Sequence, residues 1–224
     1  MPRSANALFV DMSNITVLGG TGYTGGAIVS EALKRGHAVT VVSRSAPAAP
    51  IEGVTYVTGS ALDGAVLDAA FQGADVVVTA TTSRGEASQA APHIAEGLAE
   101  RAAASGTRIV VVGGFSSLRP AAGAPRFIEG DVPEQYRAEA QAGHDALEAL
   151  LAAPEAVNWT FVSPPAAYGS WIPGEPTGAY RLSDDVALLD ETGSSTITAA
   201  DLALAILDVI ESGDYAREHV SVAL

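Results

Sequence analysis

The sequence predicts an α/β fold in which helices cover both faces of a mostly parallel, doubly wound sheet. Short runs rich in β-branched residues recur along the chain, most of them are apolar throughout, and helix-like segments separate them. Continuous apolar runs are typical of strands buried on both faces of a parallel sheet, and their alternation with helices is typical of βαβ units. The 224 residues leave room for one such domain, spanning 1–224.

The predicted elements follow one another in a regular order. The apolar, β-branched runs predict strands at Ile15–Leu18, Ala38–Val42, Val54–Val57, Asp75–Ala80, Arg108–Val112 and Trp159–Ser163. Alanine-rich segments between and after them predict helices at approximately 25–35, 63–72, 88–104, 135–152 and 199–212. Thr198 and Asp201 have the spacing of a capping box, which would begin the last helix. A final run, His219–Ala223, is expected to add one more edge strand.

Two segments fall outside this alternation. Residues 1–13 are expected to form an N-terminal tail, in which Met12 offers an alternative start. The stretch 164–195 is rich in Gly, Pro, Tyr and Ser, and long irregular insertions of this kind are usually functional or disordered. Because the insertion follows the sixth strand, we expect it above the carboxyl ends of the strands, where ligands bind in open α/β sheets.

Composition excludes several classes of function. Twelve Lys and Arg against 26 Asp and Glu give a net charge of −14, which disfavours nucleic acid and anionic membranes as partners. The absence of Cys excludes disulfides, thiolate metal sites and cysteine nucleophiles, and four scattered histidines predict no metal site. No apolar stretch approaches the roughly 20 residues of a membrane span, and no signal-peptide core is present. A cytoplasmic location is therefore expected.

The strongest motif is the run Gly19-Gly20-Thr21-Gly22-Tyr23-Thr24-Gly25, directly after the first predicted strand. It satisfies both G-x-G-x-x-G and G-x-x-G-x-x-G. Glycines allow a sharp turn, a close approach of pyrophosphate to the backbone, and tight packing of the following helix. The start of that helix offers free N–H groups and a positive dipole end to phosphate. The position between a strand and a helix predicts a Rossmann-like dinucleotide-binding fold.

The end of the second predicted strand bears on the choice of dinucleotide. An acidic residue there would select NAD, but this chain has Ser43-Arg44-Ser45 and no carboxylate. Arg44 can pair with a 2′-phosphate and stack on adenine, and the serine hydroxyls can donate hydrogen bonds. NADP is therefore favoured as cofactor, while use of NAD stays open.

Several strings together resemble the atypical short-chain dehydrogenase/reductase superfamily. They are the glycine loop, Ser43-Arg44, Gly59-Ser60-Ala61-Leu62-Asp63 and Gln72-Gly73-Ala74-Asp75-Val76-Val77. The string from Asn158 to Pro165, the segment Pro173–Tyr180 and the final-helix signature at 197–203 resemble the NADH-flavin reductases and the biliverdin IX-beta reductase group. The resemblance covers nearly the whole chain from Ile15 onward.

This resemblance implies roles for particular positions. By the resemblance, the pyrophosphate would be held by Gly19, Thr21, Gly22, Tyr23, Thr24 and Gly25, and the 2′-phosphate by Ser43 and Arg44. Adenine would be flanked by Ser60 and Ala61, and the nicotinamide ribose would be lined by Ala80, Thr81 and Thr82. The nicotinamide would be enclosed by Gly113 to Ser117 together with Ser163, Pro164, Pro165 and Ala166. Relatives often have Gly-Asp where this chain has Gly59-Ser60. Bilin-reducing relatives carry His at the place of Ala166, so this departure disfavours a bilin substrate.

The usual catalytic pair of the wider superfamily, Tyr-x-x-x-Lys, is missing. None of the six tyrosines has a lysine four residues later, and Lys34, the only lysine, lies in the first predicted helix. A flavin or quinone acceptor needs this pair less, because the protein then mainly stacks and orients two flat rings. Ser116 and Ser117 are candidate catalytic hydroxyls, with a simple turn-capping role as the alternative. The acceptor is expected to lie beside Ala166 and a lid of Tyr168, Trp171 and Tyr180, which could equally pack the insertion itself.

The sequence thus predicts an NADPH-dependent oxidoreductase that transfers hydride to a flavin, quinone or similar conjugated small molecule. The alternative is a non-catalytic NADP sensor resembling NmrA-like regulators, which keep the dinucleotide fold without turnover. The aromatic, Pro-rich insertion at 164–195 favours the enzyme, since it builds a small-molecule pocket more naturally than a protein-docking face. A homodimer is compatible with either interpretation.

Overall fold

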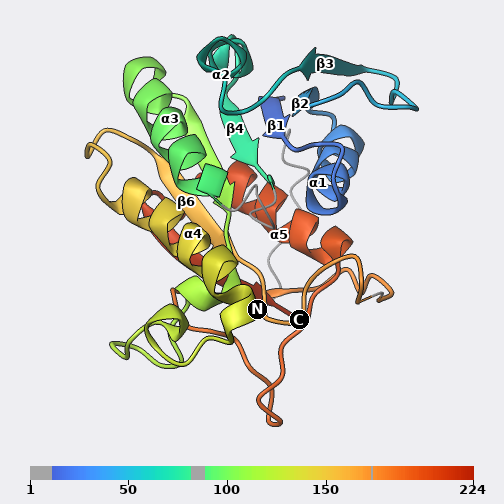
Figure 1. The fold of residues 1–224 in the computed structure, drawn as a ribbon. Coiled ribbons are helices and arrows are strands. Elements are labelled where there is room, and N and C mark those ends of the chain that lie inside the picture. Colours follow the sequence, from blue (N-terminus) through green and yellow to red (C-terminus); the bar gives the residue numbers. More distant parts are fainter. Residues whose placement is uncertain (1–11, 82–88, 173) are drawn as a thin grey trace.

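In the part of the chain that the structure describes, eight strands form one sheet in the order β3-β2-β1-β4-β5-β6-β8-β7 (Figure 1). The computed structural model describes residues 12–81, 89–172 and 174–224. The strands are β1 (Asn14–Leu18), β2 (Ala38–Ser43), β3 (Val54–Thr58), β4 (Val76–Thr79), β5 (Arg108–Val112), β6 (Trp159–Ser163), β7 (Arg181–Ser183) and β8 (Glu218–Ala223). In these ranges all neighbouring strands pair in parallel except β7, which runs antiparallel to β8. The order of β1 to β6 is that of a doubly wound Rossmann sheet, which confirms the predicted fold class.

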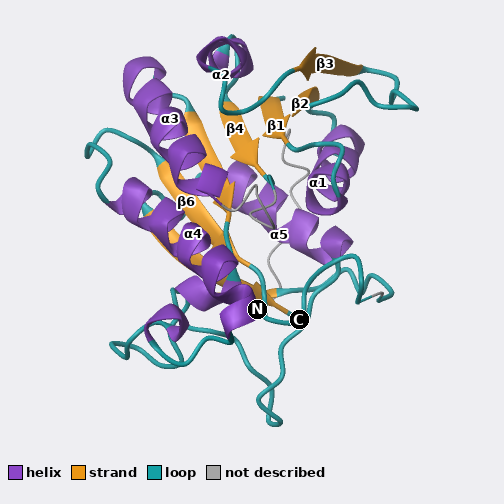
Figure 2. Cartoon of the chain, viewed as in Figure 1, coloured by secondary structure: helices purple, strands orange, loops and turns teal. Residues whose placement is uncertain are grey.

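Helices pack on both faces of this sheet (Figure 2). The helices α1 (Tyr23–Lys34) and α5 (Ala199–Ser212) lie together on one face, and α2 (Gly64–Phe71), α3 (Ala90–Ser105) and α4 (Glu134–Leu151) cover the other. Neighbouring strand residues serve opposite faces: Val17 belongs to the cluster with α1 and α5, and Leu18 to the cluster with α2, α3 and α4. Alternate burial on two apolar faces explains why the strands read as continuous apolar runs.

The predicted elements agree closely with the structure, with two differences in the C-terminal part. The predicted and observed ends of the five α-helices differ by no more than two residues. The short strand β7 was not predicted, because its three residues lie within the Gly- and Pro-rich insertion. The prediction that the final run forms an edge strand is wrong. Residues Arg181 to Ser183 pair with Ala223 to Ser221, so β8 lies between β6 and β7.

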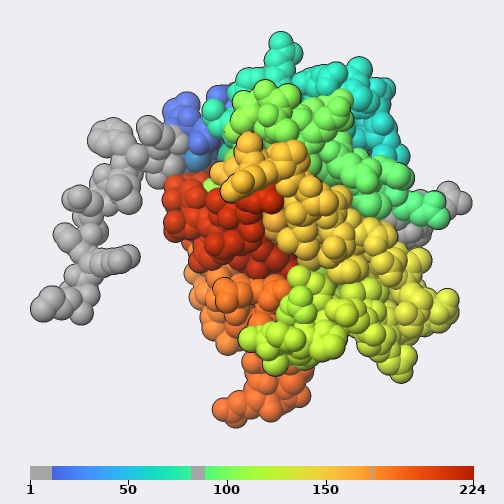
Figure 3. Space-filling view, turned by 90° about the vertical axis from the view of Figure 1, so that its left-hand side faces the viewer, coloured from blue at the N-terminus to red at the C-terminus, as the bar shows by residue number. Residues whose placement is uncertain are grey.

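The insertion after β6 is attached to the body of the protein by two carboxylates. The buried Asp201 carboxylate in α5 accepts hydrogen bonds from the N–H groups of Thr177 (3.1 Å) and Gly178 (2.8 Å). Asp185 accepts from the Nε of Arg119 at 2.9 Å. Figure 3 shows part of the segment, in orange, standing out beside the red C-terminal elements. These two carboxylates hold the insertion on either side of its strand β7, which itself pairs with β8.

Thr198 is the N-cap of α5 and forms one half of the predicted capping box. The Asp201 N–H donates to the Thr198 hydroxyl at 3.1 Å, and that hydroxyl donates to the Asp201 carboxylate at 2.7 Å. Burial alone would raise the pKa of Asp201, but hydrogen bonds from Thr198, Thr177 and Gly178 outweigh it and lower the pKa below its ordinary value. The Asp201 carboxylate thus binds both the N-cap hydroxyl of α5 and the backbone of the insertion. Within the described ranges, no helix is both long and apolar enough to span a membrane.

Candidate dinucleotide-binding site

The loop between β1 and α1 contains the predicted phosphate-binding glycines. Gly19 has a left-handed φ of 78°, and its N–H donates to the Val42 carbonyl at 2.9 Å. Gly22 is the N-cap of α1, and no side chain caps this end of the helix. Thr21, Gly22 and Tyr23 are exposed. The first-turn N–H groups and the positive end of the helix dipole are therefore available to an anion.

The glycines of this loop have different structural roles. A methyl group on Gly25 would overlap the backbone of Gly19, so Gly25 allows α1 to pack against the loop. A methyl group on Gly22 would lie 3.2 Å from the Gly19 carbonyl oxygen, and Gly22 has an ordinary φ of −83°. The fold therefore needs Gly25 more than Gly22. Gly22 instead leaves the backbone surface open, and this open surface has room for the predicted pyrophosphate.

The end of β2 leaves Arg44 exposed beside this loop. The Ser43 hydroxyl donates to the Ser45 carbonyl at 2.7 Å, which closes a turn around Arg44. Arg44 has no hydrogen bond or ion pair with any other residue that the structure describes. Because Gly19 bonds to Val42, the residue before Ser43, the glycine loop and Arg44 are neighbours. Both groups that were predicted to bind phosphate thus meet at one edge of the sheet.

The predicted adenine-flanking residues follow β3, next to the same turn. The Gly59 N–H donates to the Ser43 carbonyl at 2.9 Å, which brings the β3 end against the β2 end. Ser60 is exposed, and its hydroxyl accepts from the Leu62 N–H at 3.2 Å. Ala61 is half-buried against the core. Ser60 is therefore the member of this pair that faces solvent beside Arg44.

The predicted ribose-lining residues begin at the end of β4. The Ala80 N–H donates to the Leu18 carbonyl at 2.9 Å, and the Ala80 backbone lies directly against Gly19. The Thr81 hydroxyl lies 3.1 Å from that of Thr79. Ala80 and Thr81 are therefore next to the glycine loop, whereas Thr82 lies outside the described residues.

The ends of β5 and β6 are joined through Gly113 and Gly114. The Gly113 N–H donates to the Val162 carbonyl at 2.8 Å, and the Ser163 hydroxyl donates to the Gly114 carbonyl at 2.9 Å. Phe161 packs against Gly113 in the space that a Cβ would occupy. Pro164 and Pro165, which come next in the chain, are buried, whereas Ala166 is exposed. The two predicted nicotinamide-enclosing segments are therefore held together.

The two candidate catalytic serines differ in accessibility. Ser116 is half-buried, but Ser117 is only 1% exposed, and its hydroxyl has no partner among the described residues. The Ser117 carbonyl accepts from Arg126 at 2.6 Å. Only Ser116 is placed to meet a ligand without a movement of the loop.

The insertion reaches the phosphate side of the site through Tyr168. The Tyr168 and Thr24 hydroxyls lie 2.6 Å apart, and the rings of Tyr168 and Tyr23 have centroids 5.7 Å apart. Burial, the largest influence, raises the pKa of Tyr168 above its ordinary value. Tyr168 was predicted to bind the acceptor, but the structure brings it together with two residues of the predicted pyrophosphate site.

Of the other two aromatic residues of the expected lid, Trp171 packs within the insertion and Tyr180 lies away from the glycine loop. Trp171 is 54% exposed, and its ring packs on Gly169 within the insertion. The Tyr180 hydroxyl donates to Asp208, which also pairs with Arg35 at the end of α1 opposite the glycine loop. A helix of 12 residues spans about 18 Å, so Tyr180 and Tyr168 stand at opposite ends of α1.

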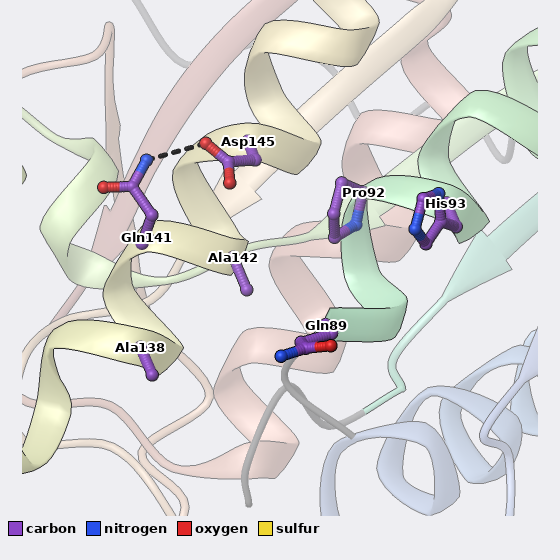
Figure 4. Close-up of a pocket in the computed structure, with 7 residues that line it drawn as sticks. All are labelled: Gln89, Pro92, His93, Ala138, Gln141, Ala142 and Asp145. Atoms are coloured by element: carbon purple, nitrogen blue, oxygen red, sulfur yellow. Dashed lines mark hydrogen bonds between the residues drawn. The ribbon is translucent and has the colours of Figure 1, made fainter. Parts of the chain in front are cut away.

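A cavity of about 390 Å³ lies between α3 and α4, on the face opposite α1 (Figure 4). Pro92 and His93 come from α3, and Gln141 and Asp145 from α4. Gln141 donates to Asp145 at 2.7 Å along the same helix. The cavity contains none of the predicted site residues. In the part of the chain that the structure describes, no three His, Asp or Glu side chains gather to hold a metal.

Comparisons with known proteins agree with this geometry. A family model described as NAD(P)H-binding matches residues 19–213. An uncharacterised protein of Bacillus subtilis, YwnB, is 30% identical over 213 residues, which cover 93% of this chain and 97% of that protein.

Two solved structures are similar over their whole length. One, provisionally named an exported protein from Burkholderia pseudomallei, has 36% identity and a TM-score of 0.82, and covers 95% of this chain and 100% of its own. The other, provisionally named an NADH-flavin reductase from Streptococcus pneumoniae, has 31% identity and a TM-score of 0.81, and covers 94% and 99%.

Proposed function

The chain belongs to the NAD(P)H-binding family, and from this premise we propose that it is an NADPH-dependent oxidoreductase that reduces a flavin, a quinone or a similar conjugated small molecule. The observation that carries the proposal is that the start of α1, which no side chain caps, lies next to the exposed Arg44. The first can hold a pyrophosphate, and the second can bind the 2′-phosphate that distinguishes NADPH from NADH. The relative from Streptococcus supports the reaction class by its provisional name.

The proposed binding mode places the cofactor across the carboxyl ends of the strands. The N–H groups of Tyr23 and Thr24 would hold the pyrophosphate, and Arg44 the 2′-phosphate. Gly113 and Pro165 would lie beside the nicotinamide. When bound, the reduced nicotinamide supplies a hydride, which an electron-poor ring accepts together with a proton from water.

The chain's own residues support an acceptor that needs no tuned proton donor. Lys34 lies at the last turn of α1, where its Nζ is 3.3 Å from the Glu31 carboxylate. It therefore stands at the end of the helix opposite the glycine loop and cannot lower the pKa of a tyrosine near the nicotinamide. Orientation of two flat rings then becomes the main contribution of the protein.

Steady-state oxidation of NADPH against a panel of flavins, quinones and carbonyl compounds tests this proposal. We expect turnover with at least one flavin or quinone, lower turnover with NADH, and none with simple ketones. The Gly22→Val variant, which should remain folded but lose the cofactor, is the control for contaminating activity. Tight NADPH binding with no turnover would favour a non-catalytic sensor instead.

A cytoplasmic location belongs to the same proposal. The relative from Burkholderia is provisionally named an exported protein, so fractionation of cells that produce this chain decides the point. Recovery in the cytoplasmic fraction would support our proposal, and recovery outside it would overturn the location without affecting the chemistry.

A further inference from the structure

A buried chain of polar side chains lies below the carboxyl ends of β5 and β6. His219 of β8 is 9% exposed, and its Nε2 lies 2.9 Å from the Ser163 hydroxyl at the end of β6. That hydroxyl donates to the Gly114 carbonyl at 2.9 Å. On its other side, His219 Nδ1 lies 3.3 Å from Arg126, which is also buried. The sequence analysis did not single out His219 or Arg126, because they belong to no motif and are far apart in the chain.

The chemistry of Arg126 fixes the direction of these hydrogen bonds. A guanidinium group only donates, so His219 Nδ1 must accept, and the proton of the neutral imidazole must lie on Nε2. Nε2 then donates to Ser163, whose own proton is directed to Gly114. Each hydrogen bond in the series from Arg126 through His219 and Ser163 to Gly114 has a donor and an acceptor when His219 is neutral. Protonation at Nδ1 would break this order, because two donors would face each other.

The surroundings of His219 favour the neutral ring. Burial is the main cause that lowers the pKa of His219 to about 3, and the positive charge of Arg126 adds to it. Arg119 and His144 act in the same direction, whereas Asp185 opposes them. Asp185 lies 3.1 Å from Arg126 and 2.9 Å from Arg119, so it offsets part of this positive charge.

His219 also supports the neighbouring residue of the β5 loop by packing. The Phe161 ring meets the imidazole edge-on, with centroids 5.1 Å apart and planes at 87°. The same ring fills the space above Gly113 that a side chain would need. His219 therefore acts on two successive residues, on Gly113 through Phe161 and on Gly114 through Ser163.

The chain of contacts continues into the insertion. Asp185 belongs to residues 164–195, and it joins Arg126 to the part of the protein that we expect above the acceptor. The insertion is thus connected to the β5 loop through Arg126, His219 and Ser163. Ser163 is fully buried, so neither it nor His219 is placed to touch a ligand itself.

We propose that His219, held as the neutral tautomer with its proton on Nε2, is a positioning residue that fixes the Gly113–Gly114 segment against the nicotinamide ring of the bound cofactor. This inference rests on the proposed function, because it assigns that segment to the nicotinamide. The adenosine end of the cofactor is held by other residues, at Arg44 and the glycine loop, and should not depend on His219.

Two ligands separate these ends of the site. NADPH contacts both, whereas adenosine 2′,5′-bisphosphate lacks the nicotinamide and reports on the Arg44 end alone. We expect His219→Leu to weaken NADPH binding about tenfold, the scale of one lost hydrogen bond, and to leave the affinity for the bisphosphate unchanged. His219→Gln, whose amide can still donate to Ser163, should recover most of the NADPH affinity. Calorimetric titration measures both.

Ser163→Ala keeps the experiment decisive if His219→Leu does not fold, since it removes only the link to Gly114 and should also weaken NADPH alone. Equal losses for both ligands, or no loss for either, would overturn the role of His219. Nitrogen NMR of the free protein should show a proton on Nε2 of His219, and a proton on Nδ1 would overturn it as well. Failure of the unchanged protein to bind NADPH or the bisphosphate would instead overturn the proposed function.

Discussion

Acidification should destabilise this protein through His219, and the size of the effect follows from its burial. The ring is neutral in the folded protein because its pKa falls to about 3, whereas the unfolded chain should have the ordinary value near 6.5. Between these values the unfolded state binds a proton that the folded state excludes. The contribution of His219 to the free energy of unfolding is therefore complete above about pH 6.5 and is lost as the pH falls toward about 3.

The magnitude can be worked out from the two pKa values. At about pH 5 the unfolded His219 is almost fully protonated and the folded one is not, which costs about 2 kcal/mol of unfolding free energy relative to about pH 8. Any folded pKa below about 4 gives nearly the same loss, because the unfolded value then sets it. This loss is a large fraction of the stability of a typical domain.

Urea unfolding of the wild type and of His219→Gln at both pH values isolates this contribution. Other groups titrate in both proteins. The informative quantity is therefore the loss of unfolding free energy between the two pH values in the wild type, minus the same loss in His219→Gln. We expect the loss to be about 2 kcal/mol smaller in His219→Gln than in the wild type. His93→Gln is the matched control, since it makes the same substitution at an exposed position of α3 and should behave as the wild type does. Equal losses of unfolding free energy in the wild type and in His219→Gln would refute the claim that His219 is buried and neutral in the folded protein.

Four further predictions concern the proposed site. Arg44→Ala should weaken NADPH binding by about 1–3 kcal/mol and barely change NADH binding, and equal losses in titration would refute the 2′-phosphate assignment. Gly22→Val should keep the circular dichroism spectrum but lose NADPH, whereas Gly25→Ala should lower the melting temperature; NADPH binding by Gly22→Val would contradict the loop assignment. Tyr136 lies in the first turn of α4, is exposed, and has Ala140 instead of lysine four residues later. Tyr136→Phe should therefore retain most activity with a flavin or quinone, and a loss of about a hundredfold in kcat would indicate a general acid and a carbonyl substrate. Trp171→Ala should raise KM for the acceptor in steady-state assays, and an unchanged KM would remove Trp171 from the acceptor site.

Local sequence signals were sufficient for the strands β1 to β6 and for the glycine-rich turn between β1 and α1. Strands such as Arg108–Val112 are read correctly because burial on both faces requires continuous apolar residues. The position of the glycine motif between a strand and a helix was predicted correctly, because the turn at Gly19 and the close helix packing at Gly25 each require a glycine. These constraints act within a few residues, so they are visible in the sequence.

Features that depend on contacts across the fold were not visible in the same way. Tyr168 was assigned to the acceptor side, but its hydroxyl meets Thr24, which precedes it by 144 residues. The strand β7 has only three residues and forms because β8 offers it a free edge. The neutral state of His219 depends on Arg126 and Ser163, which the topology alone brings together. No local pattern encodes such meetings.

Hydride transfer can be followed directly by mixing the protein anaerobically with NADPH and a free flavin, and by recording the absorbance of both compounds. The central claim predicts that NADPH is oxidised and flavin reduced in equal molar amounts, at a rate that is proportional to protein and far above the protein-free rate. The same mixture with Gly22→Val should show only the protein-free rate. If the absorbances of NADPH and of the acceptor fall no faster than in the protein-free mixture, with flavins and with quinones alike, the result would contradict an oxidoreductase that acts on conjugated rings.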